Sequence, residues 1–277
     1  MVTHAINTII GDAIIGRSLR LSVGSPVGSL IMKIEGSVVL LTGANGGIGK
    51  ALAHELVRRG AAKIYLAARD PASLQQLISS SDRLVPVSLD VTRPEQIADV
   101  AVVASDITLL INNAGVAAYT GVLSAKDIAA ARQEMEVNYF GVLSLVQALR
   151  NAPAFQAGGA IVNLLSILSL VTLPVAGTYS ASKAAALALT RTLRAELKGR
   201  GVQVLGALPV QTDTKLGAAL PEPKLTPDEV ASGILDALEA GDEEVFPGQL
   251  SRGAAQAFAA DPAGMQATMS AFVHAIA

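Results

Sequence analysis

The sequence predicts an α/β fold in which helices cover both faces of a single, doubly wound parallel sheet. Short, mostly apolar runs recur along the chain, as strands buried on both faces require. Segments with helix-start signals lie between those runs, and repeated units of strand, helix and strand build parallel sheets. The chain has 277 residues, of which 51% are hydrophobic and 16% charged, so it can bury a large core.

The predicted strands follow one another in order along the chain. They span 37–42 (SVVLLT), 63–68 (KIYLAA), 83–89 (RLVPVSL), 107–112 (ITLLIN), 160–165 (AIVNLL) and 202–208 (VQVLGAL). A further short strand is expected at EVF, residues 244–246. No internal repeat and no change of composition marks a second domain, so all of these strands are assigned to one sheet.

The helices between these strands begin at recognisable residues. The first is expected to begin near Ile48, and Asp70 before a proline is typical of a helix cap. Long helices are expected over about 125–150 and 178–198. A hydroxyl residue three positions before an acid predicts a capping box, and this pattern occurs at Thr92, Ser124 and Thr226.

The two ends of the chain are assigned outside the sheet. Residues 1–31 lack the basic start of a secretory signal, so they are expected to be a poorly ordered extension. The Rossmann-type sheet and its helices are expected over 32–250. A helical tail over 251–277 is expected to pack on this domain or on a neighbouring subunit rather than contact substrate, since apolar residues recur there at helical spacing: Met265, Met269, Phe272 and Ile276.

Charge and composition argue against several classes of function. The formal net charge is −2, which gives no electrostatic reason to expect a nucleic-acid partner. The chain has no cysteine and its three histidines lie far apart, so no metal site is expected. A serine hydrolase elbow, Gly-x-Ser-x-Gly, is missing. No apolar stretch is long enough for a membrane helix, and we expect a cytoplasmic protein with no membrane partner.

A glycine-rich segment, TGANGGIGK at residues 42–50, joins the first predicted strand to the first helix. It fails as a triphosphate loop because Ala44 replaces the first glycine and Ala51 replaces the hydroxyl residue that binds magnesium. Glycines at this place let the backbone approach a pyrophosphate, whose charge the helix N-terminus favours. The alternative is a tight turn that holds no ligand.

Later motifs favour a dinucleotide site. NNAG (112–115) ends the fourth strand, and YSASK (179–183) begins a long helix. Ser166 lies thirteen residues before the tyrosine of that motif, and Asn138 lies in EVNYFG. In this order, the glycine loop and these motifs resemble the short-chain dehydrogenase/reductase family, from Met32 to about Phe246. The resemblance implies a Rossmann fold, a nicotinamide cofactor and oxidoreductase activity.

Tyr179 and Lys183 share one helix face because they are four residues apart. We expect the Lys183 ammonium to lower the pKa of the Tyr179 phenol, ordinarily about 10, so that it exchanges a proton near pH 7. The resemblance implies that Tyr179 protonates the developing alkoxide, that Ser166 hydrogen-bonds the same oxygen, and that Lys183 also holds the nicotinamide ribose. It implies that Asn138 positions a water that passes protons toward Lys183. The structural alternatives are a core tyrosine, a solvated lysine, a turn-capping serine and a solvent-facing asparagine.

Arg69 carries the prediction that NADP(H) is preferred over NAD(H). Family members that use NAD have an acid where this chain has Ala68, whereas the Arg69 guanidinium can bind a 2′-phosphate. Asp70 is close enough in sequence to pass for the acid of the NAD-using members, but we assign it to the cap of the following helix. The expected cofactor contacts are Gly43, Asn45, Gly47, Ile48, Gly49, Arg69, Asp90, Val91, Asn113, Ala114, Gly115, Tyr179, Lys183, Pro209 and Thr212.

One segment departs from the family pattern. Members commonly have Pro-Gly after the sixth strand and then a threonine that contacts the nicotinamide amide, but here Val210 stands in the glycine's place. Either Thr212 or Thr214 could take the role of that threonine. About a dozen residues separate Thr214 from the next helix cap, so any lid over the site is short.

The substrate is expected to be a neutral hydrophobic or aromatic ketone or aldehyde. The residues that the resemblance places beside the carbonyl carry no fixed charge: Val116, Ala117, Leu168, Val171, Leu173 and Leu216. The predicted function is therefore reversible, NADPH-dependent carbonyl reduction by a homodimer or homotetramer. The alternative is a dinucleotide-binding sensor or scaffold without turnover, which would have no need of the tyrosine phenol.

Overall fold

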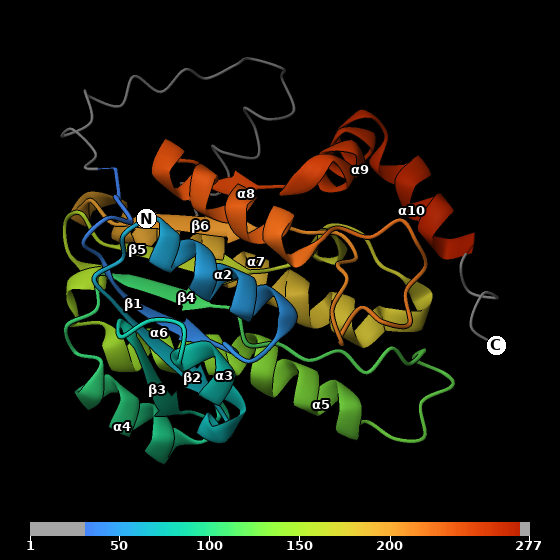
Figure 1. The fold of residues 1–277 in the computed structure, drawn as a ribbon. Helices are drawn as coiled ribbons and strands as arrows, with labels where there is room; N and C mark the ends of the chain where they lie inside the picture. The colour runs from blue at the N-terminus through green and yellow to red at the C-terminus, as the bar shows by residue number, and fades with distance from the viewer. Residues whose placement is uncertain (1–30, 272–277) are drawn as a thin grey trace, which may run out of the picture.

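The computed structural model describes residues 31–271 (Figure 1), and over these residues the strands form one parallel sheet of seven strands in the order β3-β2-β1-β4-β5-β6-β7. The strands are β1 (Val38–Thr42), β2 (Lys63–Ala68), β3 (Leu84–Ser88), β4 (Leu109–Asn112), β5 (Ala160–Leu164), β6 (Gln203–Ala207) and β7 (Glu244–Val245). All six long predicted strands are confirmed to within two residues at each end, and the predicted doubly wound sheet is confirmed.

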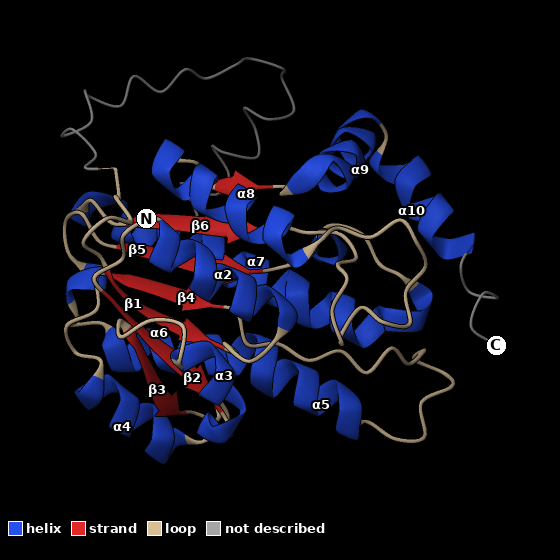
Figure 2. Cartoon of the chain, viewed as in Figure 1, coloured by secondary structure: helices blue, strands red, loops and turns tan. Residues whose placement is uncertain are grey.

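Helices cover both faces of this sheet (Figure 2). The α-helices in the described residues are α2 (Gly47–Arg58), α3 (Gln75–Ile78), α4 (Pro94–Val103), α5 (Ala129–Met135), α6 (Gly141–Leu149), α7 (Gly177–Leu197), α8 (Pro227–Ala240), α9 (Gly248–Ala260) and α10 (Pro262–Ser270). Helices α2 and α8 pack together on one face, while α4, α6 and α7 lie on the other.

Two apolar cores lie on the two faces of the sheet. Along β1, Val39 and Leu41 enter the core beneath α2 and α8, whereas Leu40 enters the core beneath α4, α6 and α7. Successive side chains of a strand point to opposite faces, so both sets must be apolar. This is why the strands appear in the sequence as nearly continuous hydrophobic runs.

The predicted helix starts have mixed outcomes. Thr226 forms the expected capping box with Glu229, and the Asp70 carboxylate caps a short 3-10 helix by accepting from the Ala72 amide. The cap at Thr92 is wrong, because its hydroxyl donates to Asp90 and α4 begins only at Pro94.

The cap at Ser124 is also wrong. The Ser124 hydroxyl donates to the Gly121 carbonyl, and α5 begins at Ala129, where the Asp127 carboxylate accepts from the amide. The long helix expected over about 125–150 therefore starts later. It also contains a π-helical turn, Glu136–Phe140, between α5 and α6.

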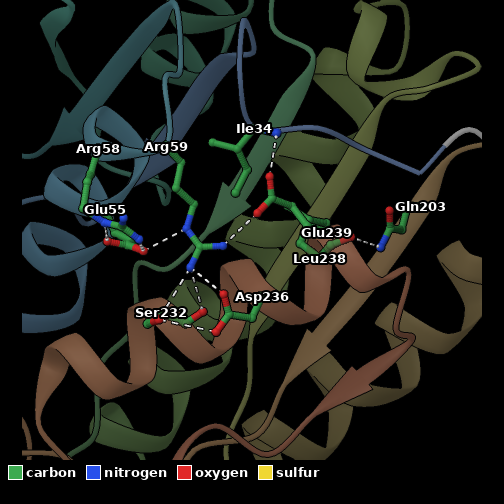
Figure 3. A network of polar contacts seen from close by, with 9 residues as sticks. All are labelled: Ile34, Glu55, Arg58, Arg59, Gln203, Ser232, Asp236, Leu238 and Glu239. Carbon is green, nitrogen blue, oxygen red and sulfur yellow. Dashed lines mark hydrogen bonds and ion pairs between the residues drawn. The ribbon is translucent and has the colours of Figure 1, made fainter.

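A polar network joins α2 to α8 at the end of α2 remote from the glycine loop (Figure 3). The Arg59 side chain, 11% exposed, donates to Glu55, Asp236 and Glu239 at 2.6 to 2.8 Å. Glu239 also accepts from the Ile34 amide at 3.3 Å. The network ties the segment before β1 and two helices into one unit.

The described residues include only part of the predicted N-terminal extension and C-terminal tail. The extension over 1–31 lies outside the described residues except for Ile31, and so do Phe272 and Ile276 of the tail. Helices α9 and α10 occupy the described part of the predicted tail. Between residues 31 and 271, no helix combines the length and the apolar composition needed to cross a lipid bilayer.

Candidate active site

The carboxyl ends of the strands surround one cavity of about 1010 Å³. The chain runs outward in opposite directions from β1 and β4, so the loops that follow these strands separate and leave a crevice. The expected cofactor contacts all line this cavity, together with Ser166. The structure thus brings together residues that are as much as 169 positions apart in the sequence, from Gly43 to Thr212.

The glycine loop bends tightly against the segment that follows β4. Gly43 has φ +64°, and a Cβ atom there would lie 2.8 Å from the Ala114 Cα, so no other residue fits without a shift. The Thr42 hydroxyl accepts from the amides of Asn113 and Ala114 at 3.0 Å. These contacts fix the two loops on either side of the crevice relative to each other.

Positive charge gathers along the cavity although the chain has a net charge of −2. Lys50, Arg69 and Lys215 line it with Lys183, against a single lining carboxylate, Asp90. Arg69 is exposed at the end of β2, and within residues 31–271 it makes no hydrogen bond or ion pair. Its guanidinium is therefore available to an anionic ligand.

Asp90 keeps its negative charge in this setting. Burial favours its neutral form, but hydrogen bonds from the Thr92 hydroxyl (2.7 Å) and amide (2.9 Å), and the nearby charge of Arg69, lower the pKa of Asp90 below its usual value. The same Thr92 hydroxyl that fails as a helix cap therefore holds a cavity-lining carboxylate.

Lys183 is 5% exposed and has no carboxylate partner in the described structure. Its ammonium donates to the Leu164 carbonyl at 2.7 Å and lies 5.9 Å from the centre of the Tyr179 ring. Burial lowers the pKa of Lys183 to about 8. The alternative of a solvated lysine is excluded.

The prediction that Lys183 lowers the pKa of Tyr179 is wrong. Burial raises the pKa of this tyrosine, Tyr119 and Glu134 raise it further, and only the Ser166 side chain acts in the opposite direction. The ammonium of Lys183 is directed to the Leu164 carbonyl, so burial decides the pKa of the phenol. Tyr179 is protonated at neutral pH.

Ser166 both caps a turn and reaches the site. It precedes a 3-10 helix (Ile167–Ser169), where its hydroxyl accepts from the Leu168 amide at 3.1 Å and Ser169 bonds back to its backbone. It also lines the cavity beside Tyr179. The structural and functional alternatives for this serine are therefore compatible.

Asn138 lies in the π-helical turn and is 1% exposed, so it does not face solvent. Its amide group bonds to both the amide (3.0 Å) and the carbonyl (2.9 Å) of Val116, and donates to the Ser182 hydroxyl at 2.9 Å. A Cβ atom on Gly115 would touch both the Asn138 Oδ1 and the Lys183 Nζ. Asn138 therefore lies just beneath the cavity, close to Lys183, although it does not line the wall.

The segment after β6 forms a short lid. Val210, which replaces the family's glycine, donates its amide to the buried Ser251 hydroxyl at 3.0 Å. Thr212 pairs with Leu225 and closes the base of the lid, and the Thr214 methyl group packs against Gly47. Both candidate threonines line the cavity.

Not every expected substrate contact lies where it was predicted. Val171 is buried in an apolar cluster and Ala117 does not reach the cavity. The described part of the tail packs on the domain as predicted, since Met265 and Met269 of α10 join the cluster of Ile167 and Val171, and both methionines also line the cavity. The remaining expected contacts line it: Val116, Leu168, Leu173 and Leu216.

Sequence reasoning missed two residues near Tyr179. Tyr119 lines the cavity with its ring 6.2 Å from that of Tyr179, and its φ of +50° is unusual for a residue other than glycine. Glu134, 1% exposed, holds this loop by accepting from the Ala118 amide at 2.8 Å. Neither belongs to a motif, and their contacts are made only by folding.

No group of three or more His, Asp or Glu side chains in residues 31–271 could hold a metal ion. The donors around the cavity are instead backbone amides and cationic side chains. Such a set suits phosphate groups rather than a metal.

The short chain dehydrogenase family description matches residues 37–224. The short-chain dehydrogenase PC-15 of Penicillium crustosum is 40% identical over 182 residues, which span 63% of this chain and only 65% of that protein. An uncharacterized oxidoreductase of Staphylococcus aureus (strain MW2) is 33% identical over 214 residues, which span 73% of this chain and 90% of that protein.

Solved structures share the fold. A short-chain dehydrogenase from Burkholderia cenocepacia J2315 in complex with NADP is 45% identical with a TM-score of 0.80, covering 86% of this chain and 99% of that one. An NADPH bound carbonyl reductase from chicken fatty liver is 28% identical with a TM-score of 0.69, covering 74% and 92%. The sheet, the site motifs and these matches agree: the chain belongs to the short-chain dehydrogenase family.

Proposed function

We propose that this protein is an NADPH-dependent oxidoreductase that reduces a neutral, hydrophobic ketone or aldehyde to an alcohol, and that it also catalyses the reverse reaction. The observation that carries the proposal is the convergence of Ser166, Tyr179 and Lys183 on the same cavity as the glycine loop and Arg69. If the glycine loop were only a tight turn without a ligand, nothing would explain why Tyr179 and Lys183 line the same cavity.

The cavity fits a dinucleotide. The glycine loop leaves no room for a side chain at Gly43, and α2 begins at the loop and presents free amides to a pyrophosphate. Arg69 would hold a 2′-phosphate with a bidentate guanidinium, which favours NADPH over NADH. When bound, NADPH supplies the hydride. The NADP complex of the Burkholderia relative and the NADPH complex of the chicken carbonyl reductase support this cofactor.

Tyr179 serves as the proton donor to the carbonyl oxygen. An acid that must give its proton to an alkoxide has to hold that proton beforehand, and burial keeps the pKa of Tyr179 high. An alkoxide is a far stronger base than a phenolate, so the transfer remains favourable. The Ser166 hydroxyl hydrogen-bonds the same oxygen and orients it.

Lys183 returns a proton to Tyr179 and binds the nicotinamide ribose. Its pKa of about 8 lets both protonation states be populated near neutral pH. Asn138 uses both amide protons and one oxygen lone pair on Val116 and Ser182, so one lone pair of Oδ1 remains for a water that faces Lys183. That water is the proposed route for proton resupply.

We further propose that two copies of the chain pair through α5–α6 and α7, in a dimer or a tetramer, and that the protein is cytoplasmic. Family resemblance and the exposed Phe140 between α5 and α6 support the pairing. Light scattering at micromolar concentration tests it, and a monomeric mass contradicts it.

The test of the proposed function follows NADPH absorbance with a panel of alkyl and aryl ketones and aldehydes. We expect oxidation of NADPH with hydrophobic members of the panel and a much slower reaction with NADH. Tight NADPH binding without turnover on any carbonyl or alcohol would favour a sensor instead.

A further inference from the structure

We propose that α10 provides a subsite for an alkyl chain attached to the reacting carbonyl, with Met265 and Met269 as its wall. This inference rests on the proposed function and names the substrate class: long-chain aliphatic ketones. Helix α10 follows the residues 37–224 that the family description matches, so the two methionines of the wall lie outside that description.

The two methionines reach the same space as the reacting groups. Met265 and Met269 line the cavity that Ser166 and Tyr179 also line. They are four residues apart on α10 and so share one helix face. Their side chains therefore form a continuous apolar surface on the wall of the substrate-bearing space.

Met265 is fixed against the turn that carries Ser166. It is 9% exposed and packs with Ile167, the first residue of that turn, and with Val171 just beyond it. Met269 is partly buried in the same cluster. A substitution at Met265 or Met269 therefore alters the packing beside Ser166. Neither methionine belongs to the proposed catalytic set of Ser166, Tyr179 and Lys183.

A reciprocal pair of hydrogen bonds holds α10 in place. The Thr172 amide donates to the Gln266 Oε1 at 2.9 Å, and the Gln266 Nε2 donates to the Thr172 carbonyl at 3.0 Å. Thr172 lies between the Ser166 turn and Leu173, which also lines the cavity. Gln266 therefore couples the position of α10 to the loop that closes the substrate side.

The surrounding side chains favour an aliphatic occupant. The cavity lining includes the Tyr119 ring and Lys215, but six of its side chains are leucines or methionines, without a charge or an aromatic ring: Leu168, Leu173, Leu216, Leu220, Met265 and Met269. Methionine is unbranched with three rotatable side-chain bonds, so it adapts to a chain of variable conformation better than to a rigid ring.

The test measures kcat/KM for 2-alkanones from butanone to decanone at saturating NADPH. In the wild type we expect an increase of about fourfold per added methylene until the subsite is full. Met269→Ala should flatten this increase, and Met269→Phe should end it at a shorter chain. Thr268→Ala is the matched control, since its exposed hydroxyl bonds only within α10, and it should leave the series unchanged.

Gln266→Ala tests the coupling. It should raise KM for the long alkanones by about tenfold, the loss expected from one or two hydrogen bonds, and leave butanone and NADPH unaffected. Thermal melting checks that each variant is folded.

Three results would overturn the subsite, although carbonyl reduction would stand. They are a wild-type series without length dependence, a series that Met269 variants do not alter, and a preference for aryl ketones over alkanones of equal carbon number. No turnover of any carbonyl would overturn the proposed function and this inference with it.

Discussion

Arg59 and Lys183 are both nearly buried cations, but their surroundings differ. Arg59 follows α2 at the end remote from the cavity and is held by three carboxylates, which raise the pKa of its guanidinium despite burial (Figure 3). Lys183 lies at the cavity with one backbone carbonyl as its partner, and burial lowers its pKa to about 8.

The difference shows how the surroundings of a buried cation set the cost of its charge. The Arg59 guanidinium stays protonated in proteins, its three carboxylate partners stabilise the charge further, and these contacts link α2 to α8. A buried cation left without a counter-charge has a destabilised charged form, so it gains and loses its proton near neutral pH. The proposed proton transfer through Lys183 would account for a buried cation that the fold leaves without a counter-charge.

The largest expected effect is the difference in kcat/KM between variants of the two cations. Lys183→Ala should lower kcat/KM by about 10² to 10⁴-fold, the range typical for loss of a proton-transfer group, and should also raise the Kd for NADPH. Steady-state kinetics and NADPH fluorescence titration measure the two effects. Arg59→Ala should leave kcat/KM per folded molecule unchanged. A loss of turnover without any loss of NADPH affinity would show that Lys183 does not contact the ribose.

The pH dependence of stability gives the next largest effect. The pKa of Lys183 falls from 10.5 to about 8 on folding, so the unfolded chain binds more protons between these values and stability rises with pH across this window. Below about pH 8 the cost of the buried charge is fully present, on the order of 3 kcal/mol. Urea unfolding at pH 7 to 10 should show wild type gaining stability relative to Lys183→Met. Parallel curves for the two proteins would contradict the buried, unpaired lysine.

Arg69 tests the cation that the described structure leaves without a partner. Arg69→Ala should raise the Michaelis constant for NADPH by about 10 to 100-fold, since charge-assisted hydrogen bonds to a phosphate are lost, with little change for NADH. Initial rates with both cofactors measure this. Equal weakening of NADPH and NADH, or equal use of both by wild type, would mean that Arg69 does not recognise the 2′-phosphate.

The smallest effect concerns the Arg59 network alone. Arg59→Ala should lower the free energy of unfolding by about 1 to 2 kcal/mol, a modest loss because the Asp236 and Glu239 side chains are 65% and 39% exposed. Arg58→Ala is the control, because Arg58 pairs with the same Glu55 but its side chain is 70% exposed. Chemical denaturation should find little change for Arg58→Ala, and an equal loss in both variants would show that burial of Arg59 adds nothing.

Local patterns in the sequence were sufficient for the sheet and for most of the site. The apolar runs of β1, β2, β4, β5 and β6 are buried on both faces, so composition alone marks them, whereas the edge strand β3 is buried only at Leu84. The helix starts at Thr92 and Ser124 were wrong because α4 begins only at Pro94 and α5 only at Ala129, and the two hydroxyls donate to Asp90 and Gly121 instead of accepting from helix amides. A capping pattern states which bonds are possible, and tertiary contacts decide which are made.

Contacts between residues far apart in the chain could not be predicted from the sequence. Spacing placed Lys183 beside Tyr179, but whether its ammonium lowers the phenol's pKa depends on the Leu164 carbonyl and on burial, which no spacing reveals. The apolar residues of the tail, Met265 among them, recur at helical spacing, but this spacing does not reveal which surface the helix packs against. The reciprocal bonds between Gln266 and Thr172 join residues 94 positions apart, so no local pattern predicts them. The proposed substrate wall therefore became visible only in the structure.

The central claim is that Tyr179 donates the proton in an otherwise complete cofactor and substrate site. The direct measurement compares Tyr179→Phe with wild type in NADPH binding, by fluorescence titration, and in turnover of the best ketone of the panel. The account predicts a Kd for NADPH within about twofold of wild type and a fall in kcat of about 10² to 10⁴-fold, because only the transferable proton is removed. Retained turnover in Tyr179→Phe would contradict it.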